Sequence, residues 1–300
     1  MLLIIIMNLL FASTFRIGKA GLQYTDAYIL TGSRMIIAGA LFLCLHYLHN
    51  RKKGSLISSV DGWLFAKAAL FYVILSFVPE FWALTYISPL KANILWSGLP
   101  FASALLSYFL LKERLTPYKI IGLCIGFAAL IPVLCIPDQS ASTIHHTVHK
   151  FLPEIMMFIA VISTAYAWLL IKQLLDKGYS LITINGITMT VGGIATIALR
   201  YVMMGTAQPL VTNYWYAAQA IIALTIVSNI IGYMIYGHLL KTYSLTLLSF
   251  SGFLCPIFGA FIERCVFNQA IDYRYIIAFI GIFIGLYIFY RSELTHKKIS

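Results

Sequence analysis

The sequence predicts an all-α integral membrane protein with ten transmembrane helices in two inverted five-helix repeats. Of its 300 residues, 61% are hydrophobic and 10% are charged, whereas soluble domains are about 45–50% apolar and about 25% charged. The mean hydropathy is +0.88, and apolar runs of membrane-spanning length recur along the chain. The two halves of the chain also share spaced motifs. The composition excludes a disordered chain and a small disulfide scaffold.

A helix needs roughly 20 apolar residues to cross the hydrocarbon layer. Runs of that kind lie near 2–20, 27–48, 63–86, 90–111, 117–136, 152–173, 180–203, 216–240, 245–267 and 273–291. The first run lacks a basic leading region and a cleavage site of small residues. It is therefore expected to be a span rather than a cleaved signal peptide.

Basic residues in the short loops predict the orientation. With the N-terminus in the cytoplasm, the cytoplasmic side collects Arg51, Lys52, Lys53, Lys67, Lys112, Arg114, Lys119, Lys172, Lys177, Lys241, Arg291, Lys297 and Lys298. The outer side collects the smaller set Arg16, Lys19, Lys91, Lys150, Arg200, Arg264 and Arg274. The protein is therefore expected to lie in the inner or plasma membrane, with both termini in the cytoplasm. We attribute the net charge of +11 mainly to the excess of basic residues in the cytoplasmic loops. No nucleic-acid partner is therefore expected.

Repeated motifs connect the third, fourth and fifth spans with the eighth, ninth and tenth. Thr85 matches Thr242 at an offset of 157 residues, and Pro100 matches Pro256 at an offset of 156. Five spans per copy is an odd number, so the second copy must enter the membrane inverted, as in many secondary transporters. The predicted division is a first repeat at 1–136, an outer linker at 137–150, a second repeat at 151–291 and a cytoplasmic tail at 292–300.

The fifth and tenth spans each contain a GxxxG pair, Gly122 with Gly126 and Gly281 with Gly285. Small residues four apart let helices approach closely in lipid. Packing within the chain is one interpretation and a dimer seam is the other, so a monomer or a weak homodimer is expected.

Several motifs occur along the chain: FWALTYIS at 81–88, Pro100, LLKERLTP at 110–117, Gly122, FASTF at 11–15 followed by Lys19, Arg34, and AYAW at 165–168. Together they resemble the EamA-like branch of the drug/metabolite transporter superfamily. The resemblance implies cytoplasmic termini, a central cavity lined by helices one to four and six to nine, and a packing role for helices five and ten. The second copy departs from the pattern, with Asn268 and Gln269 where the first has Lys112 and Glu113.

Two ionisable residues inside spans are the leading transport candidates, because such groups cost about 2.5–3.5 kcal/mol at a helix centre. Glu80 follows Pro79, which can kink the helix, and is expected to bind a cationic substrate group or a proton. Arg34 is expected to bind an anionic group or gate the cavity. Structural interpretations stay open: a salt bridge from Glu80 to Arg34 or Lys19, or pairing of Arg34 with carbonyls.

Further candidates complete the predicted site. Asn93, Trp96 and Pro100 share one helix face, and their repeat partners at offset 156 are Ser249, Gly252 and Pro256. Paired prolines suggest two bent helices at a shared cavity. The remaining candidates are Trp82, Tyr86, Tyr233 and His238. Structural alternatives are core packing for the aromatic residues and a hydrogen-bonded histidine.

Other polar groups are given structural roles. Glu263 beside Arg264 is expected to be solvated at the membrane interface, and the histidines at 145, 146 and 149 to lie in a solvated loop. The five cysteines have no CxxC spacing, so neither disulfide nor zinc is indicated. No metal or cofactor is expected, and no Walker or Rossmann motif is present.

These features predict a secondary transporter of a small polar metabolite that works by alternating access, and not an enzyme. A carboxylate and an arginine in one cavity favour an amino-acid-like zwitterion. The resemblance also allows a nucleoside-like metabolite such as S-adenosylmethionine, or a drug exporter. Rival hypotheses are a channel-like facilitator, an intramembrane enzyme, and a scaffold or lipid flippase.

Overall fold

The computed structural model describes residues 2–49, 61–111, 116–134, 151–205, 211–243, 248 and 251–297. Within these ranges the named elements are all helices. One isolated β-bridge joins Thr25 to Val211. The predicted all-α class is therefore confirmed.

The helices of the first half follow the predicted spans closely. They are α1 (Leu2–Gly21), α2 (Ala27–His49), α3 (Gly62–Ala69), a π-helix (Leu70–Ile74), α4 (Leu75–Tyr86), α5 (Pro89–Trp96), α6 (Leu99–Leu111) and α7 (Pro117–Leu134). The third span is thus three continuous helical pieces, and the fourth is two helices joined at Ser97 and Gly98.

The second half repeats this pattern. It contains α8 (Leu152–Asp176), α9 (Leu181–Met204), α10 (Tyr214–Leu224), a π-helix (Thr225–Gly232), α11 (Tyr233–Thr242), α13 (Leu254–Cys265) and α14 (Tyr273–Lys297). The π-helix of the eighth span overlaps the position of the first π-helix at the repeat offset of 157 residues.

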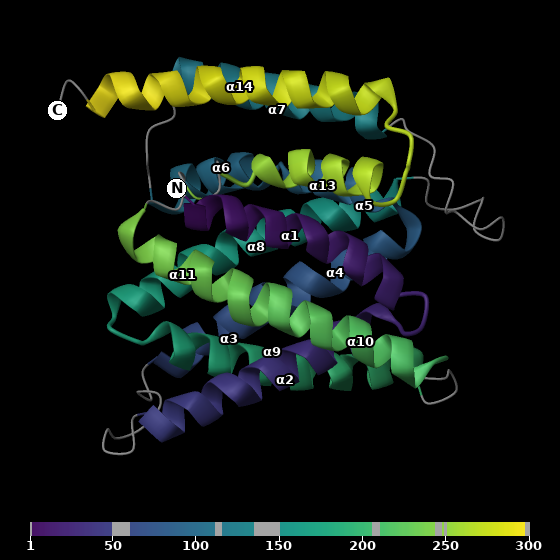
Figure 1. Ribbon diagram of the computed structural model, residues 1–300. Helices are drawn as coiled ribbons and strands as arrows, with labels where there is room; N and C mark the ends of the chain where they lie inside the picture. The colour runs from purple at the N-terminus through teal and green to yellow at the C-terminus, as the bar shows by residue number, and fades with distance from the viewer. Residues whose placement is uncertain are drawn as a thin grey trace.

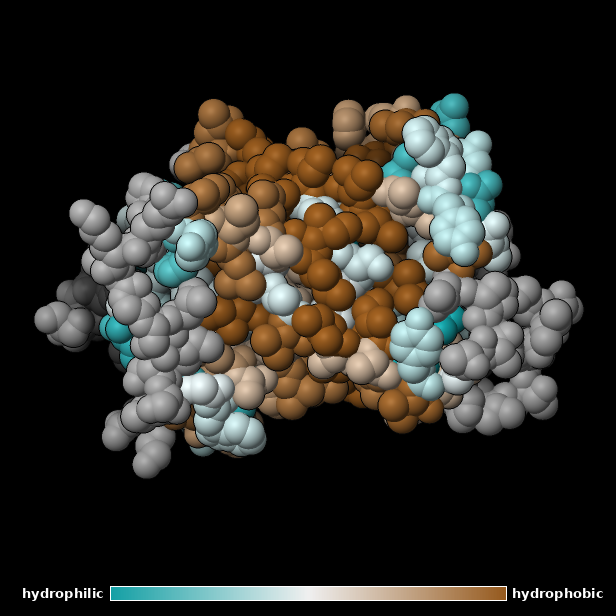
Figure 2. Space-filling model, turned by 90° about the horizontal axis from the view of Figure 1, so that it is seen from below, coloured by the Kyte–Doolittle hydropathy of each residue, from teal (hydrophilic) through white to brown (hydrophobic). Residues whose placement is uncertain are grey.

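The molecule is an integral membrane protein. Eight helical segments in the described residues are long and apolar enough to cross a membrane. The ninth and tenth predicted spans are represented by α13 and α14, which fall short of that test over the described residues. Figure 2 shows apolar side chains over the middle of one face and polar ones toward both ends. That distribution suits a bilayer flanked by water.

The helices run side by side in layers (Figure 1). The pair α7 and α14 forms one edge, and the pair α2 and α9 lies at the opposite edge. Between them lie α1, α4, α8, α10 and α11, with α5, α6 and α13 beneath the α7–α14 pair. The resemblance assigned helices five and ten to packing, and their place at the edge fits that expectation.

Side-chain contacts show that the two halves enter the bundle from opposite ends. Lys19, near the end of α1, donates hydrogen bonds to carbonyls at the end of α4. Lys91, at the start of α5, pairs with Glu154 at the start of α8. The first helix of one half therefore ends where the first helix of the other half begins, as an inverted repeat requires. We call this the Gly21 end and the opposite one the His49 end.

The α2–α9 contact has the symmetry of a two-fold axis. A Cβ atom at Gly39 would lie 3.1 Å from the carbonyl oxygen of Gly186, and one at Gly193 would lie 2.9 Å from that of Gly32. Gly32 and Gly39 correspond to Gly186 and Gly193 at one offset of 154 residues. Contacts that exchange partners in this way are the mark of a self-complementary interface.

The two GxxxG motifs face each other within the chain. A Cβ at Gly285 would lie 2.7 Å from the carbonyl oxygen of Gly122, and one at Gly281 would lie 2.5 Å from the side chain of Ala129. Close packing of α7 on α14 therefore explains both motifs without a second copy of the protein.

Candidate functional site

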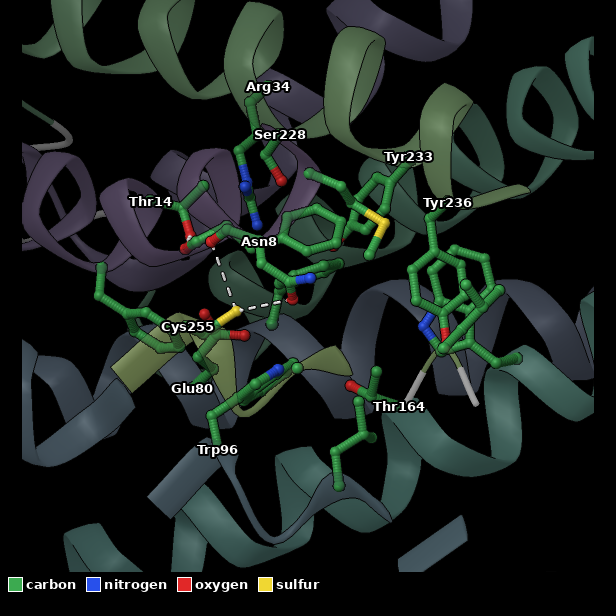
Figure 3. A pocket seen from close by; sticks show the side chains of 18 residues that line it. Asn8, Thr14, Arg34, Glu80, Trp96, Thr164, Ser228, Tyr233, Tyr236 and Cys255 are labelled. Carbon is green, nitrogen blue, oxygen red and sulfur yellow. Dashed lines mark hydrogen bonds between the residues drawn. The ribbon is translucent and has the colours of Figure 1, made fainter. Parts of the chain in front are cut away.

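A cavity of about 50 Å³ lies at the centre of the bundle (Figure 3). Its lining residues are Met7, Asn8, Phe11, Thr14, Phe15, Arg34, Phe77, Glu80, Trp96, Leu99, Thr164, Trp168, Ser228, Tyr233, Tyr236, Leu248, Gly252 and Cys255. Both halves contribute. Of the eight helices that the resemblance implies, all except the seventh, α9, supply lining residues within the described part of the chain.

Arg34 extends from α2 into this cavity with 1% of its surface exposed. Its guanidinium carbon lies 4.4 Å from the ring centre of Phe77 and 4.6 Å from that of Phe81. Attraction to the two ring faces offsets part of the cost of removing the cation from water. Its Nε and Nη2 have no hydrogen-bond partner among the described residues, so two donor nitrogens remain available.

Glu80 enters the cavity from α4, on the opposite side from Arg34 (Figure 3). It is 3% exposed, and its Oε2 atom has no hydrogen-bond partner in the described part of the chain. The helix is irregular here, because Pro79 lies inside α4 and the π-helix precedes it. Ser76 Oγ donates to the Phe71 carbonyl at 2.5 Å. Such irregularities are frequent at functional sites.

The structure tests the salt bridges from Glu80 to Arg34 or Lys19 that the sequence left open. No ion pair within 4.0 Å joins Arg34 to Glu80 in the structure as described. Lys19 Nζ donates to the carbonyl oxygens of Leu84, Thr85 and Ile87 at 2.8, 2.9 and 3.1 Å. Lys19 therefore caps the end of α4, two turns or less beyond Glu80.

A cluster of aromatic rings forms one side of the cavity. Tyr233 lies 6.1 Å from Phe77 and 5.7 Å from Trp168, measured between ring centres. Trp168 stacks on Tyr236 at 3.9 Å. A continuous row of rings thus leads from the Arg34 cation to the Trp168–Tyr236 pair. Of these rings only Tyr233 was among the predicted site residues.

Small polar groups line the remaining wall, and the sequence prediction missed them. Asn8 Nδ2 donates to Ser251 Oγ at 3.2 Å, and the Cys255 thiol donates to the Asn8 side-chain oxygen at 3.3 Å. Thr164 Oγ1 donates to Ser76 Oγ at 2.9 Å, which links α8 to α4. Thr14 and Ser228 complete the set. A signal existed for Asn8, since it is a polar residue inside an apolar span.

Trp82 and Tyr86 lie outside the central cavity, although both were expected in it. Their rings are 4.9 Å apart, and they line a separate pocket of about 320 Å³ at the Gly21 end, together with Tyr24 and Asp26. Both residues lie on α4 beyond Glu80, so the helix carries them past the cavity to its outer side.

Three more of the predicted site residues are absent from the described lining of the cavity: Asn93, His238 and Ser249. Asn93 is buried away from the cavity, and its Nδ2 donates to the carbonyl oxygens of Pro89 and Ala12 at 3.1 and 3.4 Å. The His238 side chain is exposed on the surface of α11. The expectation that these two face the cavity is therefore not met in this conformation. Ser249 lies outside the described residues.

The predicted helix-bending prolines lie at real irregularities. Pro100 follows the turn at Ser97 and Gly98 that separates α5 from α6, and Pro256 follows a turn at Gly252 and Phe253. Pro79 lies within α4. The matched turns bring Trp96 and Gly252, which correspond at offset 156, to the same cavity.

The structure corrects the expectation that Glu263 is solvated at the membrane interface. This residue is 3% exposed, and its Oε2 lies 3.5 Å from Arg16 Nη1 on α1. The partner is therefore a residue of the other half and not the adjacent Arg264. The histidines at 145, 146 and 149 lie outside the described residues.

Comparison with known proteins agrees with this architecture. The family model of the EamA-like transporter family matches residues 1–135 and 151–291. An S-adenosylmethionine/S-adenosylhomocysteine transporter of Chlamydia muridarum is 27% identical over 97% of this chain and 91% of its own length. A protein of Chlamydia trachomatis serovar L2 with the same name is 26% identical over 97% and 89%. An uncharacterized transporter of Archaeoglobus fulgidus is 26% identical over 96% of both chains.

One solved crystal structure superposes with a TM-score of 0.68, covering 99% of this chain and 98% of the other. The two sequences are 17% identical, so the similarity concerns the fold alone.

Proposed function

The chain belongs to the EamA-like transporter family, and from that premise we propose that it carries a zwitterionic metabolite across the membrane by alternating access. The observation that supports this is the pair Arg34 and Glu80. Both are buried, they have opposite charge, and both keep unused hydrogen-bonding atoms at one cavity. A substrate carboxylate suits Arg34, and a substrate ammonium group suits Glu80.

The energetics favour occupation by such a substrate. A buried charge without a partner is costly, whereas a hydrogen bond to a charged group contributes about 1.5–3 kcal/mol. A zwitterion supplies partners to both side chains at once. A solute with one charge would leave either the cation or the carboxylate unpaired.

S-adenosylmethionine and S-adenosylhomocysteine are the leading substrates. Relatives similar over nearly the whole chain carry these names, and both compounds contain a free amino-acid group. The sulfonium cation of S-adenosylmethionine also suits a cavity rich in aromatic faces. This choice joins the two alternatives from the sequence, an amino-acid-like solute and a nucleoside-like metabolite.

The small size of the cavity supports a carrier mechanism. Its volume of about 50 Å³ is far below the roughly 300–1,000 Å³ of ligand pockets, so the helices must move apart to admit a substrate. The cavity lies between the two halves, and opening toward either side in turn gives alternating access. We further propose that both termini are cytoplasmic and that the protein works as a monomer in the inner or plasma membrane.

Uptake into proteoliposomes tests this proposal. Labelled S-adenosylmethionine should accumulate saturably and should show counterflow against internal S-adenosylhomocysteine. Flux that rises linearly with concentration would instead support the channel-like facilitator. A pH gradient that drives accumulation would assign proton coupling, and Glu80 would then be the carrier of the proton.

Substitution of the charged pair tests the residues. Glu80→Gln and Arg34→Gln should each reduce uptake at least about tenfold, the equivalent of 1.4 kcal/mol, while the protein still inserts and purifies normally. Asp176→Asn and Arg264→Gln change the same charges at exposed positions and should transport normally. Normal uptake by Glu80→Gln would remove Glu80 from the mechanism.

A further inference from the structure

The Trp168–Tyr236 pair differs from the other ring contacts around the cavity. Its ring centres are 3.9 Å apart and its planes 29° apart, whereas the contacts of Tyr233 with Phe77 and Trp168 are tilted or edge-on at 5.7 Å or more. Both rings line the cavity and both are 3% exposed. A face-to-face pair at this spacing leaves no room for a third ring.

We propose that this pair is the closed form of a slot for a planar heteroaromatic ring, and that the rings part to hold the base of the substrate between them. The proposal rests on the proposed function and adds the subsite for the adenine end. Aromatic side chains stack with nucleobases irrespective of sequence, and the rings already lie parallel enough to become the two walls of such a slot.

The supports behind the two rings differ in a way that allows the slot to open. Trp168 lies on α8 and is held edge-on by Tyr72 of the first π-helix at 5.6 Å, whereas its other edge-on neighbour, Tyr233 at 5.7 Å, lies on α11 together with Tyr236. Tyr236 lies on α11, one turn after the π-helix Thr225–Gly232. Wide helical turns of that kind are short, weakly favoured and frequent at functional sites. A small rotation of α11 about this segment moves Tyr236 away from Trp168.

The position of the pair also matches the shape of the proposed substrate. The row of rings runs from Phe77, beneath the Arg34 cation, through Tyr233 to Trp168. Arg34 and Glu80 thus occupy one part of the cavity, and Tyr236 of the stacked pair lies in another (Figure 3). A molecule with an amino-acid group at one end and a base at the other can engage both.

Inhibition of uptake by fragments of the substrate tests the slot. Wild-type protein in proteoliposomes should take up labelled S-adenosylmethionine, and adenosine and methionine should each inhibit it. In Trp168→Leu and Tyr236→Leu, inhibition by adenosine should weaken about tenfold or more, while methionine inhibits as before. Tyr236→Phe keeps the ring and should therefore retain inhibition by adenosine. Trp215→Leu, on an exposed residue of α10, is the matched control.

Each outcome decides between the two proposals. Absence of wild-type uptake overturns the proposed substrate and the slot together. Uptake with unchanged adenosine inhibition in both leucine variants overturns the slot alone. An equal loss of inhibition by adenosine and methionine would assign the pair a structural role and also overturn the slot.

Discussion

At the scale of residues, a charged side chain inside an apolar span was the most informative signal in the sequence. Arg34 and Glu80 were predicted from their cost inside a span, and both line the cavity. Trp96 and Tyr233 also line it. Trp82 and Tyr86 do not, because an aromatic ring is stable in lipid, in a core or in a binding site. Residue type alone therefore cannot assign such a ring to one of these environments.

His238 shows why a repeat offset gives only approximate positions. It lies 158 residues after Glu80, close to the repeat position of Glu80, yet its side chain is exposed, whereas Tyr236, at offset 156, lines the cavity. The two π-helices are five and eight residues long. Each wide turn shifts the helix face that follows it, and the sequence does not reveal where such turns occur.

Lys19 provides a prediction for a single residue. Its ammonium group donates to three carbonyls at the end of α4, where the helix dipole favours a cation. Lys19→Met should lower the free energy of unfolding by about 1–3 kcal/mol, because carbonyls lose a charged donor. Thermal unfolding in detergent measures this. Lys172→Met, on the partly buried surface of α8, should change little, and equal stability of the two variants would contradict the capping role.

At the scale of elements, most of the fold was predictable. Spans one to eight agree with the observed helices within a few residues, because a membrane-crossing helix is set by a long apolar run. The ninth span, expected from 245, is described as α13 only from Leu254. The bend of the fourth span was expected from Pro100, but the π-helices and the rotation of each helix were not predictable. These depend on contacts between helices that are distant in the sequence, such as Asn93 of α5 against Gly259 of α13.

The crossed glycine contacts of α2 and α9 lead to a prediction for this helix pair. A methyl group at Gly193 would lie 2.9 Å from the Gly32 carbonyl oxygen and 3.0 Å from the Ile36 backbone nitrogen. Backbone atoms cannot rotate away, so the helices must separate. Gly193→Ala should destabilise the protein by about 1–3 kcal/mol, seen as a lower unfolding temperature in detergent. Gly62→Ala meets no atom within 4 Å and should leave that temperature unchanged. Unaltered stability of Gly193→Ala would mean that the helices are less closely packed.

At the scale of the whole molecule, ion pairs join the two halves at both ends. Within the described residues, Asp26–Arg200, Lys91–Glu154 and Arg16–Glu263 lie at the Gly21 end. Asp61–Lys177 lies at the His49 end, where Tyr179 also donates to Asp61 at 2.7 Å. Every one of these pairs connects one half to the other. Opening the cavity toward either end must therefore break a different set of contacts.

The Asp61 contact predicts how the His49 end responds to substitution and pH. Asp61→Asn should increase maleimide labelling of Cys255, a cavity residue, in a variant with the other four cysteines replaced by serine. Hydrogen bonds from Lys177 and Tyr179 lower the pKa of Asp61. With a depressed folded-state pKa, the contact persists above the ordinary value of about 3.9 and is lost only as the pH falls through the lower one.

Labelling between pH 5 and 8 should therefore show no step due to Asp61. Asp176→Asn, one residue before Lys177 and exposed, is the control for a change of charge at this end. If Asp61→Asn labels at the wild-type rate, the contact does not hold the His49 end closed.

The small volume of the cavity limits what it can hold when no substrate is bound. With a volume of about 50 Å³, the cavity accommodates only a few water molecules beside Arg34 and Glu80. Those waters solvate the two charges poorly, which makes the empty closed state costly compared with the loaded one. Under the proposed carrier mechanism, this cost favours exchange of solutes over net flux. Counterflow, the readout chosen for that mechanism, measures the preference directly.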